Sequence, residues 1–202
     1  MGSEAKKHDD SELMVRYMAG DENAFSEIVS LYKDPLYAFL RKFLNQQALV
    51  EDVFQDTFLQ LYASRDKFDP NRPLRPWLFT IAANKAKDAL RKIQRRSEMS
   101  LGTVASSDDM SIDDLFNMLS SYEQTPLDEV SRDETAQRVM VIIADLPENL
   151  RIILTLSYFE QFSYKQMAEI LSIPIGTVKS RLHTAVRQFA RNWKSDNESD
   201  EG

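Results

Sequence analysis

Several residue types are scarce in this chain of 202 residues, and each scarcity excludes a class of protein. It has no cysteine, which rules out disulfide bonds, thiolate catalysis and cysteine-ligated zinc. The two histidines, His8 and His183, lie far apart in sequence, and a metal site would need further ligands at suitable spacing. Neither a glycine-rich phosphate loop nor a Gly-x-Ser-x-Gly elbow is found. We therefore expect no enzyme, no cofactor, no metal site and no small-molecule substrate.

Long apolar runs are also missing. No stretch approaches the roughly 20 residues that a membrane span requires. No signal peptide opens the chain, because Lys6 and Lys7 precede acidic residues instead of an apolar segment. The sequence therefore predicts a soluble, cytoplasmic protein that does not insert into a membrane. With only five glycines and helix-forming residues throughout, it also predicts an all-α fold.

Residues 162–182 have the pattern of a helix-turn-helix. Ser163 and Gln166 fit a capping box, in which each side chain satisfies a backbone N–H at the start of a helix. Phe162 and Met167 stand where a hydrophobic staple would fix the angle at which the chain enters that helix. The turn is expected at residues 172–174, since Pro174 cannot extend the preceding helix.

A second helix is predicted from about Ile175 to Trp193. Its apolar residues step by three or four and form one stripe: Ile175, Val178, Leu182, Val186 and Phe189. The opposite face carries Thr177, Lys179, Ser180, Arg181, His183, Thr184 and Arg187. This arrangement is expected of a recognition helix whose first half enters the major groove of DNA.

The alternative is an ordinary helical hairpin with a solvated basic face. Between Lys179 and Lys194 there are five basic residues and no acid, although the whole chain has a net charge of −7. Such a local reversal of charge is typical of a nucleic-acid-binding surface. The sequence therefore favours DNA binding over the hairpin alternative.

A first helical block extends to about Arg96. Asp21 can cap its first helix, Pro35 is expected to interrupt that helix, and another helix is predicted from Leu49 to Ala63. The inward side chains of that second helix are expected to be Val53, Phe54, Phe58, Leu61 and Tyr62. A turn-rich loop at 68–73 leads into a long helix from about Pro76 to Arg96.

The end of that long helix is basic. Between Lys85 and Arg96 there are six cations and one acid, Asp88, which is a local charge of +5. A solvated helix with cations near its C-terminus is the simpler explanation. With Phe68 and Trp77 nearby, the cations also suit a platform for single-stranded nucleic acid, where bases stack on rings and phosphates meet cations.

The stretch from Glu98 to Glu134 is acidic and rich in serine. It holds ten acids and one base, and charge of one sign with low hydrophobicity favours a flexible, disordered linker. Within it, Ile112, Leu115, Phe116, Met118 and Leu119 are candidates for a short amphipathic turn. A second acidic run, from Asp196 to Glu201, closes the chain.

Taken in order, these segments resemble the bacterial sigma factors of the extracytoplasmic-function (ECF) group, which join two helical domains, regions 2 and 4. The segment 51–62 is similar to the region 2 helix that binds the core of RNA polymerase. Residues 68–70 and 76–84 resemble the segment that opens promoter DNA and captures a flipped base. Residues 144–148 and 175–183 resemble region 4.

The resemblance implies a domain division and a function. It places region 2, a helical bundle, at residues 1–96, a linker at 97–133, region 4 with its helix-turn-helix at 134–194, and an acidic tail at 195–202. It implies an alternative sigma factor that directs promoter-specific initiation, with core RNA polymerase and promoter DNA as partners and an anti-sigma factor as a possible further one. The linker would thread through the polymerase towards the RNA exit path.

The resemblance also assigns roles to individual residues. Polymerase binding falls to Asp52, Gln55, Asp56 and Phe58. Recognition and opening of the −10 element fall to Phe68, Trp77, Asn84, Lys85, Arg91 and Lys92. Recognition of the −35 element falls to Thr177, Lys179, Ser180, Arg181, His183 and Arg187. For Asn84, a satisfied amide in the core is the alternative to base capture. Thr184 and Val186 stand where the family often has arginine, which leaves fewer phosphate contacts.

Two other classes of protein compete with this interpretation. A helix-turn-helix repressor or response-regulator output domain would form a stable dimer and bind its operator tightly without polymerase. A protein-interaction adaptor would use its helices and its acidic tail. The basic, aromatic helix from Trp77 to Arg96 argues against both, because neither needs a second nucleic-acid surface.

Overall fold

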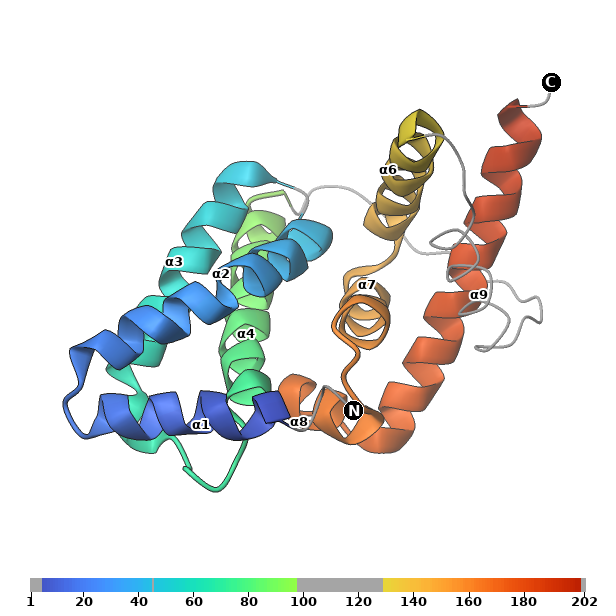
Figure 1. The fold of residues 1–202 in the computed structure, drawn as a ribbon. Coiled ribbons are helices and arrows are strands. Elements are labelled where there is room, and N and C mark those ends of the chain that lie inside the picture. The colour runs from blue at the N-terminus through green and yellow to red at the C-terminus, as the bar shows by residue number, and fades with distance from the viewer. Residues whose placement is uncertain (1–4, 45, 98–128, 201–202) are drawn as a thin grey trace. The chain divides into compact units, whose positions relative to one another are not determined.

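The computed structural model describes residues 5–44, 46–97 and 129–200, which form helices joined by short turns, with no strand among them (Figure 1). The predicted all-α class is confirmed. The first part of the chain contains α1 (Ala5–Met18), α2 (Glu22–Leu44), α3 (Gln47–Ala63), the 3-10 turn η1 (Arg65–Lys67) and α4 (Leu74–Ser97). The second contains α6 (Glu129–Asp145), α7 (Glu148–Leu154), the π-helical turn η2 (Thr155–Phe159), α8 (Tyr164–Leu171) and α9 (Ile175–Asp200).

The described chain divides into two compact units, one built mainly from α1 to α4 and the other from α6, α7, the first part of α8 (to Ala168) and α9. The expected flexibility of the linker and the expected turn around Ile112 to Leu119 fall on residues 98–128, outside the described part of the chain. The last residues of the expected linker are helical, because α6 begins at Glu129.

Contrary to the prediction, Pro35 does not interrupt its helix. α2 runs without a break from Glu22 to Leu44 with Pro35 inside it. A proline inside a helix removes one backbone hydrogen bond and costs about 3 kcal/mol. The buried face of α2 offsets this cost, because it packs side chains such as Ile28, Leu36 and Phe39 completely out of solvent.

The core of the first unit combines aromatic residues of α2 with both large and small residues of α4. The Phe39 ring lies 5.3 Å from that of Phe79 on α4, measured between ring centroids, and both side chains are fully buried. Ala82, Ala83 and Ala86 are also fully buried. Their short side chains let neighbouring helices approach α4 closely, since the distance between packed helices depends on the side chains at the contact. α4 packs along α3 and also against α2 (Figure 1).

Polar contacts fix α1 against the rest of this unit. The Tyr32 hydroxyl on α2 donates a hydrogen bond to the buried Asp10 carboxylate on α1. At the other end of α1, Arg16 forms an ion pair of 2.6 Å with Asp21. Asp21 also accepts a hydrogen bond from the Asn23 N–H at 3.0 Å, so it caps α2 as predicted.

The start of α8 has the predicted capping box. The Gln166 side-chain oxygen accepts the Ser163 N–H at 2.9 Å, and the Ser163 hydroxyl oxygen accepts the Gln166 N–H at 3.3 Å. The staple residues Phe162 and Met167 are both buried. The chain enters this helix through Gln161, whose φ of 52° lies in the left-handed region.

α9 is longer than predicted, because it continues past Trp193 to Asp200. No glycine or proline occurs between Trp193 and Asp200 to stop it. Trp193 is buried, and the Arg138 guanidinium of α6 lies 5.7 Å from its ring centroid. Arg138 also pairs with Asp196 at 2.9 Å, which ties the extension of α9 to α6.

Candidate nucleic-acid and partner interfaces

α3 presents a polar stripe to solvent. Asp52, Gln55 and Asp56 are all exposed, as expected from their spacing on a helix with 3.6 residues per turn. Phe58, the fourth residue assigned to this surface, is only 7% exposed. Its ring packs edge-on against Phe54, with centroids 5.1 Å apart. Phe58 is therefore buried and does not share the exposed surface of Asp52 and Asp56.

The stripe continues into an apolar end that the sequence did not lead us to expect. Leu59 is 65% exposed and Tyr62 is 55% exposed. The prediction that Tyr62 points inward is therefore wrong. Positions 52, 55, 56, 59 and 62 fall within one side of an α-helix at 100° per residue, so helical spacing alone could have placed both residues outward.

Tyr62 is held in place by its neighbours. Its ring lies 6.2 Å from that of Phe25 on α2, edge-on, and the Arg65 guanidinium lies 5.2 Å from its centroid. Arg65 also donates a hydrogen bond of 3.4 Å to the Tyr17 hydroxyl. Hydrogen bonds to Tyr17 and then to Tyr62 raise the pKa of Arg65 above its already high value. The exposed ring of Tyr62 is thus part of a positioned aromatic cluster.

On α4, the residue that could have been a core amide is exposed. Asn84 faces solvent, while Ala82, Ala83 and Ala86 around it are fully buried. The alternative of a satisfied amide in the core is therefore wrong. An exposed amide on an otherwise buried helical run is free to meet a ligand.

The two aromatic residues assigned to the −10 surface contact each other, and one is buried more deeply than the other. Phe68 is 4% exposed, and Trp77 is half-buried beside it, with ring centroids 5.2 Å apart. Only Trp77 presents part of its ring to solvent. Phe68 therefore supports the indole of Trp77 instead of offering a surface of its own.

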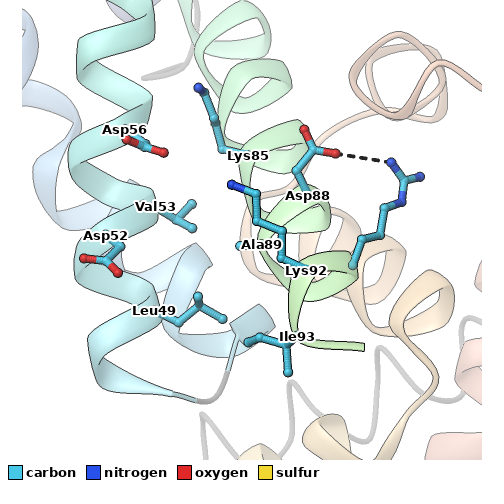
Figure 2. Close-up of a pocket in the computed structure, with 10 residues that line it drawn as sticks. Leu49, Asp52, Val53, Asp56, Lys85, Asp88, Ala89, Lys92 and Ile93 are labelled. Carbon is cyan, nitrogen blue, oxygen red and sulfur yellow. Dashed lines mark hydrogen bonds and ion pairs between the residues drawn. The ribbon is translucent and has the colours of Figure 1, made fainter. Parts of the chain in front are cut away.

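A groove of about 510 Å³ separates α3 from α4. Figure 2 shows Asp56 of α3 and Lys85 and Lys92 of α4 extending into it. Its apolar part is formed by Leu49, Val53, Ala89 and Ile93, and its charged part by Asp52, Asp56, Lys85, Asp88, Arg91 and Lys92. Three carboxylates thus accompany three cations. The charge of +5 counted along the α4 sequence is therefore reduced in the folded structure, because carboxylates of α3 lie beside cations of α4.

In the second unit, α9 has the predicted two faces. Val178, Leu182, Val186 and Phe189 are fully buried, whereas Ile175, the first residue of the expected stripe, is 44% exposed. Of the residues assigned to the −35 element, Lys179 and Ser180 are exposed. Thr177, Arg181, His183 and Arg187 are half-buried.

The hydroxyls on this face are partly used within the helix. The Ser180 hydroxyl donates to the Thr177 carbonyl oxygen at 3.2 Å, and the Thr184 hydroxyl donates to the Ser180 carbonyl oxygen at 2.9 Å. Their oxygen lone pairs stay available as acceptors. Lys179 and Arg181 are therefore the donors on this face best suited to guanine edges or to phosphates.

Nothing in the described residues points to a metal site or a membrane span. In residues 5–44, 46–97 and 129–200, no group of three or more His, Asp or Glu side chains is placed to hold a metal ion. None of the helices described is both long enough and apolar enough to cross a membrane.

Comparison with known families matches both units. Residues 28–96 match the family Sigma-70 region 2, and residues 136–189 match Sigma-70, region 4. The chain is 33% identical to the ECF RNA polymerase sigma factor SigW of Bacillus subtilis over 165 residues, covering 81% of this chain and 86% of SigW. It is 32% identical to the RNA polymerase sigma-H factor of Pseudomonas aeruginosa over 87% of this chain and 89% of that protein.

The chain belongs to the ECF sigma factors. Family membership makes it an alternative sigma factor, whose partners are core RNA polymerase and promoter DNA. Such a protein is a subunit for initiation and leaves the chemistry of RNA synthesis to the polymerase.

Solved structures agree with this assignment. Sigma factor RpoE, in complex with the anti-sigma factor NepR from Bartonella quintana, is 25% identical with a TM-score of 0.62, covering 85% of this chain and 98% of that one. CnrH, in complex with the cytosolic domain of CnrY, shares the fold with a TM-score of 0.66 at 24% identity, covering 93% of this chain and 98% of that one.

Proposed function

We propose that this sigma factor divides its work between three surfaces. The exposed stripe of α3 binds core polymerase, α4 with Trp77 captures and opens the −10 element, and the first half of α9 reads the −35 element. The chain contributes no catalysis of its own and acts in the cytoplasm. Residues 1–96 and 134–194 then serve as regions 2 and 4, with 97–133 as the linker and 195–202 as the acidic tail.

One observation carries the proposal. The first unit has an acidic stripe on α3 and, on α4, an exposed Asn84 two helical turns after the half-exposed Trp77, while the second has a helix-turn-helix with a basic face. A repressor or an adaptor has no use for all three. The sequence match to sigma factors along both units favours the same conclusion.

Within the polymerase surface, we include Leu59 and Tyr62. Large apolar side chains that stay exposed beside charged residues are typical of the anchors of protein interfaces, where aromatic residues contribute most of the binding energy. Asp52 and Asp56 would then set orientation and association rate, because charged residues at an interface steer the encounter.

The decisive experiment is copurification with core polymerase followed by run-off transcription. The purified chain should bind the core enzyme in a stable complex, and this complex should start RNA synthesis at a defined position on a cognate promoter. A stable dimer of the chain that binds DNA tightly without polymerase would contradict the proposal.

An anti-sigma factor is proposed as a further partner. RpoE, a relative by structure, was solved bound to the anti-sigma factor NepR. A regulator of this kind would compete with polymerase for α3. Capture of the tagged chain from its native host before and after stress would reveal such a competitor.

A further inference from the structure

The basic helix α4 is locally neutralised by carboxylates, some of which belong to another helix. Lys85, Arg91 and Lys92 line the groove between α3 and α4 together with Asp52 and Asp56 from α3 and Asp88 from α4 itself. Arg91 is paired with Asp88 at 3.3 Å. The charges of the side chains that line the groove therefore sum to zero.

We propose that Asp52 and Asp56 weaken the binding of single-stranded DNA to α4 while the sigma factor is free, and that polymerase removes this effect when it binds them. The inference rests on the proposed function, in which α3 meets polymerase and α4 meets DNA. It adds that the same carboxylates which recognise polymerase suppress DNA binding in its absence.

The geometry of the groove supports an effect through the electrostatic field. Among the described residues, no ion pair within 4.0 Å joins Asp52 or Asp56 to Lys85 or Lys92. Asp56, Lys85 and Lys92 nevertheless extend into one groove (Figure 2). The two lysines are therefore not held in fixed pairs and can still reach a phosphate, but a phosphate arriving there also meets the negative charge of α3.

The close approach of the two helices makes this repulsion significant. Cα atoms of α3 and α4 come within 8 Å of each other, which is about the screening length at physiological salt. The apolar part of the groove, which includes Leu49 and Val53, lowers the local dielectric and strengthens the field of nearby charges.

Polymerase would relieve the repulsion by supplying the missing charge. A partner segment that binds two exposed carboxylates must bring cations or hydrogen-bond donors to them. These neutralise Asp52 and Asp56, and the cations of α4 then act on DNA alone. By linkage, any DNA affinity gained on polymerase binding is matched by an equal gain in polymerase affinity on DNA binding. The sigma factor would thus stay off stray single strands until it is part of the polymerase.

The test compares two double variants of the full chain that change net charge equally. Asp52→Asn/Asp56→Asn removes the two carboxylates beside the groove. Asp34→Asn/Asp66→Asn removes two exposed carboxylates that do not line it, one on α2 and one on η1. Fluorescence anisotropy then measures the affinity of each free protein for a labelled oligothymidine at about 50 mM and about 200 mM salt.

We expect the groove variant to bind oligothymidine about two- to tenfold more tightly than the control variant at the lower salt, and the difference to shrink at the higher salt. Saturating core polymerase should raise the affinity of the control variant, which keeps Asp52 and Asp56, for the strand above that of the same variant alone and above that of core polymerase alone. Equal affinities of the two free variants, or no such gain by the control variant on polymerase binding, would overturn the proposal.

A third variant separates this inference from the function on which it rests. Lys85→Gln/Lys92→Gln should lower the affinity of the free protein for oligothymidine. If the lysine variant binds oligothymidine more weakly and the groove variant has the same affinity as its control, then α4 binds DNA but the carboxylates of α3 do not affect that binding. If the lysine variant binds like the wild type, the role proposed for these two α4 lysines fails.

Discussion

The buried ring of Phe68 packs against the indole ring of Trp77. Their centroids are 5.2 Å apart at an interplanar angle of 54°, and of the two side chains only Trp77 reaches solvent. The loop before α4 and the first turn of α4 are thereby joined by one aromatic contact. The position of the indole ring depends on a residue that cannot itself meet DNA without a rearrangement.

The two aromatic residues should therefore fail in different ways. Trp77→Ala should slow promoter opening, because stacking on an aromatic side chain is worth about 1–3 kcal/mol per base. Phe68→Ala should chiefly destabilise the fold, by about 3–5 kcal/mol as for other buried phenylalanines. Permanganate footprinting of the holoenzymes measures opening, and urea unfolding measures stability. Phe68→Leu, which keeps most of the volume, should open the promoter nearly normally; a severe opening defect in this stable variant would assign Phe68 a direct role.

Asn84 gives a cleaner test of the −10 surface, because it is exposed and its removal leaves no cavity. Asn84→Ala should impair promoter opening while stability stays within about 0.5 kcal/mol of the wild type, as for other surface substitutions. Permanganate reactivity of the −10 region reports the opening. Asn71→Ala, in the turn before α4, is a matched control. If the Asn84→Ala holoenzyme opened the −10 DNA as the wild type does, the role assigned to Asn84 in promoter opening would be wrong.

The exposed acid on α3 offers a test of polymerase binding. Asp56→Arg, alone or with Gln55→Ala, should abolish copurification with core polymerase, because a reversed charge at the centre of an interface can cost several kcal/mol. Circular dichroism should show an intact helical fold, since Asp56 is exposed. Asp66→Arg on η1 is the charge-matched control and should still bind. Normal polymerase binding by folded Asp56→Arg protein would remove this residue from the interface.

Local patterns were predicted well from the sequence, and long-range ones were not. The capping box of Ser163 and Gln166 was correct because all of its atoms lie within one helical turn. The break at Pro35 was wrong because the burial of α2 side chains against other helices, which the local sequence does not show, decides the outcome. The charge of α4 was misjudged for a similar reason: the acids Asp52 and Asp56, which share its groove, lie about 30 residues earlier in the sequence.

Residues early in the recognition helix α9 should contact bases, and residues later in it should contact phosphates. Arg187, well into α9, should mainly contact phosphates, so Arg187→Ala should weaken binding to all sequences alike and lower the salt slope by about one unit. Lys179→Ala and Arg181→Ala should change which −35 sequences are preferred, at about 1–3 kcal/mol for a good base contact. Selection from a promoter library measures the preference. An unchanged consensus from both variants would move base reading to Ser180 and His183.

The buried pair Asp10–Tyr32 should make the first unit sensitive to alkali. Burial, and then the hydrogen bond to Asp10, raise the pKa of the Tyr32 hydroxyl above its usual value of 10.0. The folded state therefore keeps a proton that the unfolded chain loses. The stability contributed by Tyr32 is complete below about pH 10 and is lost as the pH rises further.

Tyr32→Phe should remove this contribution and cost stability at neutral pH as well. The second oxygen of Asp10, Oδ1, already lacks a hydrogen-bond partner, so loss of the Tyr32 hydroxyl leaves a buried carboxylate with no side-chain donor from α2. Such a loss costs about 1–3 kcal/mol. Tyr37→Phe is the control, because the Tyr37 hydroxyl accepts a hydrogen bond from the exposed Gln47 amide at 2.6 Å and has no other hydrogen-bond partner among the described residues, so its removal should change stability by less than about 0.5 kcal/mol. Replacing both partners, Asp10→Leu with Tyr32→Phe, should recover much of the loss, since exchanging a buried polar pair for apolar groups can be nearly neutral. Urea unfolding at pH 7 and above pH 10 measures all four proteins. If the double variant is less stable than Tyr32→Phe alone, the cost does not come from a stranded carboxylate, and the contact serves α1 in another way.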